Sequence, residues 1–363
     1  GIATADGSGN WDVTLTQLLD TGPHTFYAQA TDAAGNVSAS SPTFTLTIDI
    51  TPPTVPVLLA VTDDVGGTVA LTNGQLTNDA LPTLNGTAEI GSTVKIFDNG
   101  VQIGSVVATN GTWSFTPTTA LADGPHSLTL TATDPTGNVS TPTTGFNITV
   151  DATAPNAPVI SSVVDDVGTV TGAVTGGNPT NDTRPTLNGT AEPNATINIY
   201  DGNVLVGTVT ADGSGNWTLP QTTTTLTEGQ HNFTATATDA AGNVSAPSSI
   251  TSITVDTTAP LVPTNLAVIT NGTHVTGSAE AGSTVTITTS TGTVLGTATA
   301  DGTGSFNVTI SPAQTNNETL LAFATDKAGN AGLTSSVVAP ITALPNAPVI
   351  ATINDNVGTV LGN

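Results

Sequence analysis

Carboxylates at repeated spacing are the side chains of this chain that could do chemistry. The segment Thr-Asp-x-x-Gly-Asn recurs, and its aspartate stands at Asp32, Asp134, Asp239 and Asp326. A segment Asp-x-Thr-x-Pro follows each of the first three at a constant distance and begins at Asp49, Asp151 and Asp256. A third segment ends in Ala-Glu, with its glutamate at Glu89, Glu192 and Glu280. A recurring trio of acids, one from each segment, is therefore the first candidate site.

Chain topology decides whether the members of such a trio can meet. If successive strands run antiparallel, the loops of a repeat alternate between the pole where the repeat begins and the pole where it finishes. We call these the leading pole and the trailing pole. All three segments fall at the leading pole, at the joint with the preceding repeat. We expect three joint sites, built by Asp49, Glu89 and Asp134, by Asp151, Glu192 and Asp239, and by Asp256, Glu280 and Asp326.

A calcium ion is the ligand that these trios suit best. Three anions within a few ångströms repel one another strongly unless a cation or protons intervene. Ca²⁺ accepts many oxygen ligands from carboxylates, carbonyls and water with tolerant geometry, whereas soft metals prefer Cys or His. The alternative is that these aspartates cap turns or start linkers without any ion.

A second group of acids falls at the trailing pole. Two repeats carry Asp-Asp-Val-Gly, Thr-Asn-Asp and an Asp turn there, and the repeat that lacks the first two has Thr289-Ser290-Thr291-Gly292 in place of the turn. The loss of all these features together is expected if the acids share one ion. We expect trailing-pole Ca²⁺ sites formed by Asp63, Asp64, Asp79 and Asp98, and by Asp165, Asp166, Asp182 and Asp201. The segment Ala343-Leu344-Pro345 lacks the linker aspartate, so we expect no full joint site and a more flexible junction there.

The composition excludes several partners. Among 363 residues, 27 acidic and 3 basic side chains give a formal net charge of −24. No basic patch can displace counterions from phosphates, which excludes nucleic acid and disfavours an anionic membrane surface. No apolar stretch is long enough to cross a bilayer, so we expect no membrane insertion in this segment. The absence of cysteine removes disulfides, thiolate catalysis and thiolate metal sites.

The same segments divide the chain into the repeats that must position these acids. We predict the C-terminal part of one repeat at 1–50, full repeats at 51–151 and 152–256, a shorter one at 257–343, and the start of another at 344–363. Units of this length can each bury a core of their own, so the chain is a string of domains rather than a solenoid.

Alternation of apolar and polar residues with a period of two predicts short strands. In the repeat at 152–256 such runs lie at 157–164, 185–191, 195–200, 204–210, 216–219, 231–238 and 250–255. Turn residues separate the runs, and no segment has a convincing helical pattern. The predicted fold class is all-β, with tandem Ig-like seven-stranded β-sandwich domains in an extended rod.

Aromatic and histidine side chains are assigned to structure. Core filling is expected of the tryptophans at matching strand starts, Trp11, Trp113 and Trp217. A bond from the ring to the turn backbone is expected of the histidines that share one turn position, His24, His126 and His231. Paired carboxylates can hydrolyse glycosides, but pairs that recur in every domain indicate architecture. We therefore expect no enzyme activity.

Together, these segments resemble a known family. The order Asp-Asp-Val-Gly, Asn-Asp-x-x-Pro-Thr-Leu-Asn-Gly-Thr-Ala-Glu, Asp-Gly-Ser-Gly-Asn-Trp, Thr-Asp-Ala-Ala-Gly-Asn-Val-Ser and Asp-x-Thr-Ala-Pro looks like the bacterial Ig-like repeats of giant type I-secreted surface adhesins of the SiiE kind. The resemblance covers nearly the whole chain. It implies export by a type I pathway, display on the bacterial surface, and Ca²⁺ that stiffens an extended stalk.

The sequence therefore leads to the hypothesis of a Ca²⁺-rigidified stalk of a bacterial cell-surface adhesin that mediates attachment to a host cell or another surface. The expected partners are the neighbouring Ig-like repeats of the same chain and a host-surface glycan or protein. We expect a monomer, secreted or held at the cell surface. Two alternatives stay open: a direct recognition module for glycan or protein, and a spacer of a secreted polysaccharide-degrading enzyme.

Overall fold

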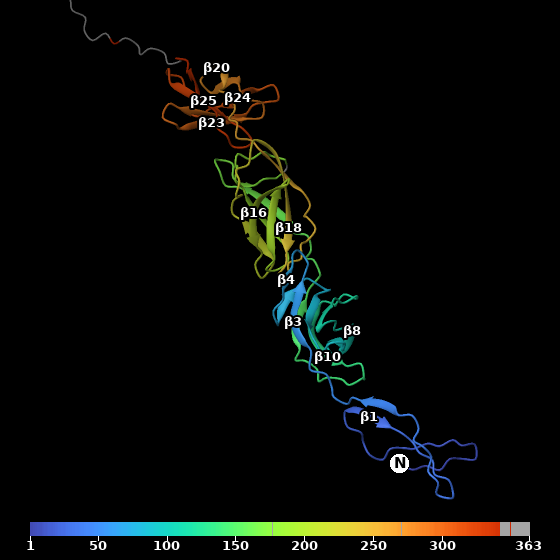
Figure 1. Cartoon of the computed structure of the whole chain (residues 1–363). Coiled ribbons are helices and arrows are strands. Elements are labelled where there is room, and N and C mark those ends of the chain that lie inside the picture. Colours follow the sequence, from blue (N-terminus) through green and yellow to red (C-terminus); the bar gives the residue numbers. More distant parts are fainter. Residues whose placement is uncertain (176, 270, 342–348, 350–363) are drawn as a thin grey trace, which may run out of the picture. The chain divides into compact units, whose positions relative to one another are not determined.

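Every regular element in the described part of the chain is a β-strand (Figure 1). The computed structural model describes residues 1–175, 177–269, 271–341 and Val349. These residues form two compact units, one of Gly1–Ala154 with Asp239–Asn243, the other of Pro155–Thr238 with the described residues from Val244 on. The all-β class of tandem Ig-like domains is confirmed, whereas the extended rod stays a prediction.

Residues 1–50 form one small sheet, in which β1 (Gly22–Phe26) pairs antiparallel with β2 (Phe44–Ile48). Trp11 is 58% exposed, so the prediction that it fills a core is wrong. The physical reason is that residues 1–50 supply two paired strands and no facing sheet against which the indole can pack.

Two facing sheets form a sandwich in residues 51–151. One has the strand order β4-β3-β6-β9, with bounds Val69–Ala70, Val57–Asp63, Thr83–Thr87 and Thr112–Phe115. The other has the order β5-β11-β10-β7-β8, with bounds Gln75–Thr77, Phe146–Val150, Gly124–Thr133, Thr93–Asp98 and Val101–Val107. Only β5 runs parallel to its neighbour, β11. That pairing brings the trailing-pole segment beside the strand that leads into the linker.

The next repeat uses the same plan. One sheet has the order β13-β12-β14-β17, with bounds Gly172–Ala173, Val159–Asp165, Thr186–Thr190 and Asn216–Leu219. The other has the order β16-β15-β18-β19, with bounds Val204–Thr210, Thr196–Asp201, Gly229–Thr238 and Thr251–Val255. Each of the seven predicted runs overlaps one of these strands, with bounds that differ by at most two residues at either end. The two-residue strand β13 was not predicted, because two residues cannot display a period.

The shorter repeat also folds as two sheets. Among its described residues the first sheet has the order β20-β21-β24, with bounds Thr264–Val268, His274–Ser278 and Ser305–Thr309. The second has the order β23-β22-β25-β26, with bounds Val294–Thr299, Thr284–Thr289, Thr319–Thr325 and Ser335–Val338. The expected features at 343–345 and the repeat start at 344–363 lie outside the described residues, apart from Val349.

Three separate apolar cores lie between these sheets, and each draws its residues from one predicted repeat. Trp113 and Trp217 are only 5% and 3% exposed, which confirms that they fill cores. In the shorter repeat Phe306 occupies the corresponding place, opposite Gly277. Segments in which apolar and polar residues alternate form these sheets because the apolar residues of each strand all point to the face that packs against the other sheet.

The described residues contain no helix that is long and apolar enough to cross a membrane.

Candidate functional site

The linker aspartates are attached to the trailing pole of the repeat before them. Strands β11 and β19 end one residue before Asp151 and Asp256, respectively. The backbone N–H of Asp151 donates to the carbonyl oxygen of Thr77 at 2.9 Å. The N–H of Asp256 donates in the same way to the carbonyl oxygen of Thr180 at 2.8 Å. From the sequence alone, these two aspartates are expected in the leading-pole trios.

Around Thr77 the structure gathers several of the expected ligands. The Thr77 hydroxyl donates to Oδ2 of Asp63 at 2.6 Å and accepts from the N–H of Asp79 at 3.1 Å. The N–H of Asp64 donates to Oδ2 of Asp79 at 3.3 Å. Thr77 therefore joins the side chain of Asp63 and the backbone of Asp79 to the backbone of the linker residue Asp151, and Asp64 is attached through Asp79.

The same arrangement recurs around Thr180. Its hydroxyl donates to Oδ2 of Asp165 and accepts from the N–H of Asp182 at 3.1 Å. The N–H of Asp166 lies 3.5 Å from Oδ2 of Asp182. Asp165 and Asp182 are only 5% and 2% exposed. Burial raises the pKa of Asp182, and the negative charges of Asp166 and Asp165 raise it further against the hydrogen bonds that it accepts.

No basic side chain balances these buried carboxylates. In the part of the chain that the structure describes, the ion pairs join histidine to aspartate, and neither lysine nor arginine takes part in one. Arg184 instead donates from Nε to the carbonyl oxygen of Thr222 at 3.0 Å. A buried carboxylate without a positively charged partner is costly, so this cluster can be stabilised by a bound cation or by protonation.

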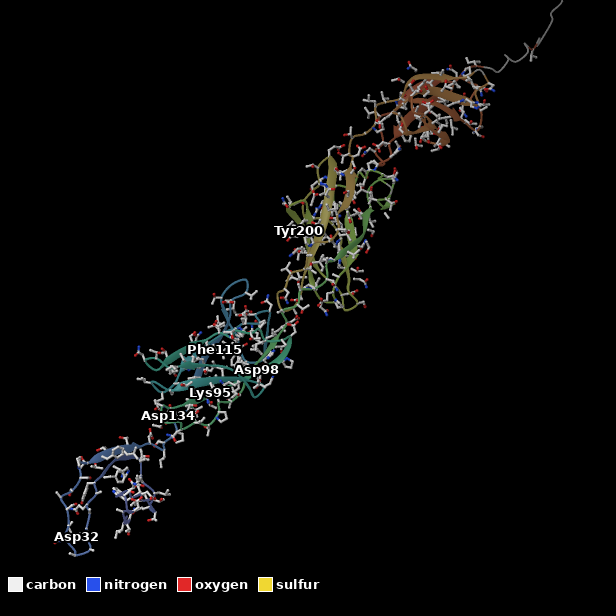
Figure 2. All side chains as sticks on the ribbon, turned by 90° about the vertical axis from the view of Figure 1, so that its right-hand side faces the viewer. Asp32, Lys95, Asp98, Phe115, Asp134 and Tyr200 are labelled. Carbon is white, nitrogen blue, oxygen red and sulfur yellow. The ribbon has the colours of Figure 1, made fainter. Side chains whose placement is uncertain are left out.

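Asp98 and Asp201 lie in a different setting, each paired with a histidine (Asp98 is labelled in Figure 2). Asp98 Oδ2 is 2.8 Å from His126 Nδ1, and Asp201 Oδ2 is 2.7 Å from His231 Nδ1. The expected ring-to-turn bonds are confirmed, since Nε2 donates to a carbonyl oxygen four residues earlier in His24, His126 and His231. Because Oδ2 of each aspartate is already paired with a histidine, we leave both out of the proposed ligand set.

The leading-pole aspartates close their own loops. Asp134, labelled in Figure 2, accepts the N–H groups of Thr136 and Asn138 on Oδ1, each at 2.9 Å. Its Oδ2 accepts from the side-chain amide of Asn138 at 2.8 Å. Asp239 and Asp326 are likewise bonded to the asparagine four residues later. Turn capping, the alternative reading of this segment, therefore occurs in all three loops.

The leading-pole glutamates take no part in these networks. Glu89, Glu192 and Glu280 are exposed, and their carboxylates accept no hydrogen bond from the described residues. Asp49 is also exposed and caps its own turn through the N–H of Thr51 at 3.0 Å. As they stand, the described residues contain no group of three or more Asp, Glu or His side chains arranged to hold an ion. The Ca²⁺ sites therefore stay a prediction.

Two further acids hold the linkers and were missed from the sequence. Asp123 Oδ1 accepts from the N–H of Ala152 at 2.8 Å, and Glu228 Oε2 accepts from the N–H of Thr257 at 2.9 Å. Both acids stand in the Asp/Glu-Gly-x-His segment, from which only the histidine had been interpreted. Burial raises the pKa of Asp256, and the charges of Asp326 and Glu228 add to that rise. Negative charge therefore concentrates where the linker begins.

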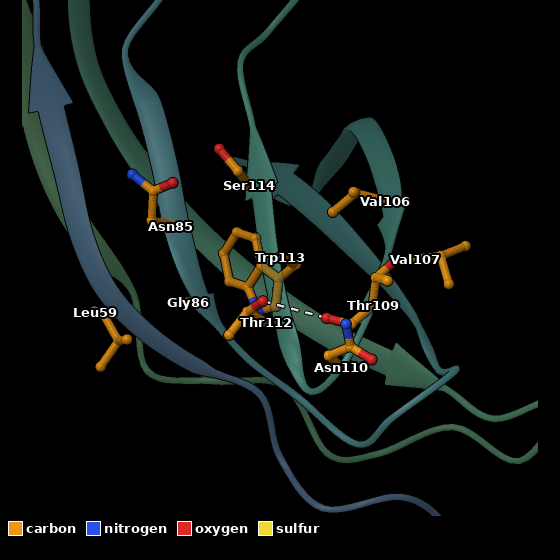
Figure 3. A pocket seen from close by; sticks show the side chains of 10 residues that line it. All are labelled: Leu59, Asn85, Gly86, Val106, Val107, Thr109, Asn110, Thr112, Trp113 and Ser114. Atoms are coloured by element: carbon orange, nitrogen blue, oxygen red, sulfur yellow. Dashed lines mark hydrogen bonds between the residues drawn. The ribbon is translucent and has the colours of Figure 1, made fainter.

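A hollow in the repeat at 51–151 offers no comparable chemistry (Figure 3). Its lining includes Leu59, Asn85, Val107 and the edge of Trp113, and no acid, histidine or lysine. The Thr112 hydroxyl donates to the Thr109 carbonyl oxygen at 3.2 Å, as drawn in Figure 3. Such a lining has no general acid, base or nucleophile pair.

The repeated sandwiches with acids at their poles match a family description along nearly the whole chain. Residues 1–50, 51–152 and 157–257 match the bacterial Ig-like domain, and residues 259–340 match the bacterial Ig domain. The chain belongs to the bacterial Ig-like domain family. In this chain the trailing-pole clusters thus lie within Ig-like domains arranged in tandem.

Among curated proteins, these Ig-like domains are similar to exoglucanase B of Cellulomonas fimi, with 34% identity over 283 residues. The match covers 72% of this chain and 23% of that protein, so the chain spans only a small part of the relative. Among solved structures, an ICAM-5 D1–D4 ectodomain fragment is 14% identical, covers 89% of this chain and 84% of its own, and has a TM-score of 0.36. Fibronectin(III)-like modules of Clostridium thermocellum CbhA are 13% identical. That match covers 51% of this chain and 89% of the CbhA chain, with a TM-score of 0.32. These scores are too low to support a functional comparison.

Proposed function

We propose that this chain is a non-catalytic stalk segment whose joints between Ig-like domains are stiffened by Ca²⁺. One observation carries the proposal. In two consecutive repeats, three trailing-pole aspartates and the linker aspartate lie around a single threonine, with no lysine or arginine in an ion pair with them in the described residues. The linker aspartate is attached to this group through its backbone N–H, while at the second joint the charges that act on its carboxylate are those of Asp326 and Glu228.

The residues that would hold the ion at the second joint are Asp165, Asp166, Asp182 and Asp256, and at the first joint Asp63, Asp64, Asp79 and Asp151. All of them offer carboxylate or carbonyl oxygens, which are the ligands that Ca²⁺ prefers. A bound divalent cation would offset the cost of burying Asp165 and Asp182 beside other acids. Because the backbone N–H of the linker aspartate binds the threonine of the same cluster, the ion would also restrain the chain between two domains. The leading-pole residues remain candidates for additional ligands.

For the biological setting, we propose an extracellular location in a bacterial surface adhesin of the type I-secreted kind. The resemblance of the repeat segments to those of such adhesins supports this assignment, and a chain without cysteine and with few basic residues is compatible with it. A stalk that is stiff would hold a terminal binding domain away from the cell, whereas a chain of freely hinged domains would not.

A second candidate is a spacer within a secreted polysaccharide-degrading enzyme. The similarity to exoglucanase B over most of this chain favours it. In this case too the Ig-like domains would be spacers, because the catalytic residues would lie in another part of the polypeptide. Isolation of the native polypeptide would separate the two candidates: glycosidase activity on the same chain supports the enzyme spacer, and its absence from the complete chain supports the adhesin.

Small-angle scattering together with calorimetric titration tests the calcium proposal. With Ca²⁺ the full chain should become longer and less flexible than in a chelator. Substitution of two buried acids, Asp165→Asn with Asp182→Asn, should remove one ion from the binding stoichiometry. The matched control is Asp212→Asn, in an exposed turn that resembles the leading-pole loops, and it should leave the stoichiometry unchanged. Equal dimensions with and without Ca²⁺, or an unaltered stoichiometry in the double variant, would refute the proposal.

A further inference from the structure

The Thr-Asp-x-x-Gly-Asn loop contacts the linker that precedes its own repeat. Nδ2 of Asn330 donates to the backbone carbonyl oxygen of Asp256 at 2.8 Å. The corresponding asparagines make the same bond to a linker aspartate, Asn243 to Asp151 at 2.7 Å and Asn138 to Asp49 at 3.1 Å. The contact thus recurs at all three linker aspartates named above.

Closure of the loop does not require this asparagine amide. A second kind of loop, at 212–216 and 301–305, is closed in the same way, with the aspartate Oδ1 accepting N–H groups from residues two and four positions later. In the loop at 301–305 the last residue is Ser305, and the closing bond from its N–H to Asp301 is still 3.0 Å. The side-chain amide of the asparagine in the first kind of loop has two N–H donors; one binds Oδ2 of its own aspartate, and the other can serve another contact.

The glycine of the loop lies against the trailing pole of the preceding repeat. Gly329 has φ +97°, and a Cβ placed on it would lie 3.3 Å from Val170 and 3.4 Å from the side-chain amide of Asn181. Gly242 has φ +102°, and its Cβ would lie 3.5 Å from the amide of Asn78. Asn78 and Asn181 are the middle residues of the two Thr-Asn-Asp segments. Both joints therefore bring the same two motifs together.

We propose that the Gly-Asn pair of this loop is a docking surface for the trailing pole and linker of the preceding repeat, and that it orients successive domains without a metal ion. The glycine permits close approach to the Thr-Asn-Asp segment, and the asparagine amide binds the linker carbonyl. Neither contact uses a carboxylate oxygen of the proposed Ca²⁺ sites. The inference thus goes beyond the proposed function and does not depend on it.

The physical basis is that one linker residue is held from both sides. At the second joint, the N–H of Asp256 is bound by Thr180 of its own repeat, and the carbonyl oxygen of Asp256 is bound by Asn330 of the following repeat. Rotation of the following domain about the linker would break the second bond or strain the first. Satisfied backbone groups on both sides of a residue restrict its φ and ψ angles, and these angles are the hinge.

Distance measurement between two spin labels tests this inference. The chain has no cysteine, so T208C and T297C, at two exposed threonines, label the full chain on either side of the second joint. In a chelator, the unaltered joint should give a narrow distance distribution. Asn330→Ala should broaden it, and Asn216→Ala, at the last position of the other kind of loop, should not. Unchanged circular dichroism and thermal unfolding of Asn330→Ala would establish that its domain is still folded.

The outcomes separate this inference from the calcium proposal. If the distance distribution measured in the chelator is equally broad for the unaltered chain and for Asn330→Ala, the inference is overturned. If Ca²⁺ then narrows both distributions, the calcium proposal stands alone. If the joint is narrow in the chelator, broadens with Asn330→Ala and does not respond to Ca²⁺, the asparagine contact stands and the calcium proposal fails. A variant that does not fold is replaced by Asn330→Ser, whose side chain is too short to reach the linker and for which the same broadening is expected.

Discussion

Trp217 lies directly over Gly189, its partner across strands β17 and β14. A Cβ on Gly189 would fall 2.2 Å from Cζ2 of the indole and 2.1 Å from the carbonyl oxygen of Val159. Trp113 and Gly86 repeat this relationship in the preceding domain, with 2.4 Å to Cζ2. The glycine of the Leu-Asn-Gly-Thr segment is therefore required by the tryptophan that fills the core above it.

Gly189→Ala should destabilise the domain at 152–256. The added methyl group has no space between the indole and a backbone carbonyl, and overpacking of a core typically costs about 1–3 kcal/mol. Differential scanning calorimetry should show a lower transition temperature for this domain, by several degrees. Gly213→Ala is the control, because a Cβ there meets nothing within 4 Å. Equal stability of the two variants would contradict the packing argument.

Trp217→Phe should be tolerated far better than Trp217→Ala. The indole N–H of Trp217 is buried without a hydrogen-bond partner, so its removal eliminates an unsatisfied donor and offsets part of the lost apolar contact. Phe306 already occupies the same place in the shorter repeat. Truncation to alanine leaves a cavity and should cost about 3–5 kcal/mol. Chemical denaturation measures both variants, and a phenylalanine variant as unstable as the alanine variant would disprove the expectation.

The pair of His231 and Asp201 should make the stability of its domain depend on pH. Burial pulls the pKa of His231 down, but the hydrogen bond to Asp201, the bond to the Thr227 carbonyl and the attraction of the Asp201 charge together raise it. A group with a raised folded-state pKa stabilises fully below its unfolded pKa, about 6.5 for histidine, and loses that contribution as the pH rises through the folded value. Stability should therefore fall from mildly acidic to alkaline pH.

Thermal unfolding at a series of pH values checks this dependence. Asp201→Asn removes the charge that favours the imidazolium, so its unfolding temperature should change less across the same pH range. The comparison isolates the pair, because every other titrating group is common to both proteins. Parallel curves for the two proteins would show that the pair has no such role.

Glu228→Gln should loosen the start of the second linker. Glu228 accepts from both the N–H and the hydroxyl of Thr257, at 2.9 Å and 2.7 Å, and a neutral amide is a weaker acceptor than a carboxylate. Amide hydrogen exchange at Thr257 should become faster. Glu192→Gln is the control, since the exposed Glu192 carboxylate accepts no hydrogen bond in the described structure. Unchanged exchange at Thr257 would exclude Glu228 as a linker clamp.

The sequence predicted which loops carry the acids of the candidate site, but not which groups those acids contact. Antiparallel order placed Asp63 and Asp79 at the trailing pole of one repeat and Asp151 with the leading-pole acids of the next, because strand polarity follows from alternation and turn spacing. It did not show that the N–H of Asp151 binds Thr77, since this bond depends on the parallel register of β5 beside β11. Sequence spacing gives no measure of such a register.

The sequence by itself determined the all-β class, the tandem Ig-like repeats and the strand positions in them, because burial on alternate faces and turn chemistry are local properties that the residue order records. Only the tertiary structure decided which group each acid meets. Asp98 meets His126 across β7 and β10, and Asp256 meets Thr180 and Asn330. A carboxylate accepts hydrogen bonds from whatever donor the packing of strands and loops brings within about 3 Å, and that distance is set by contacts far apart in the chain.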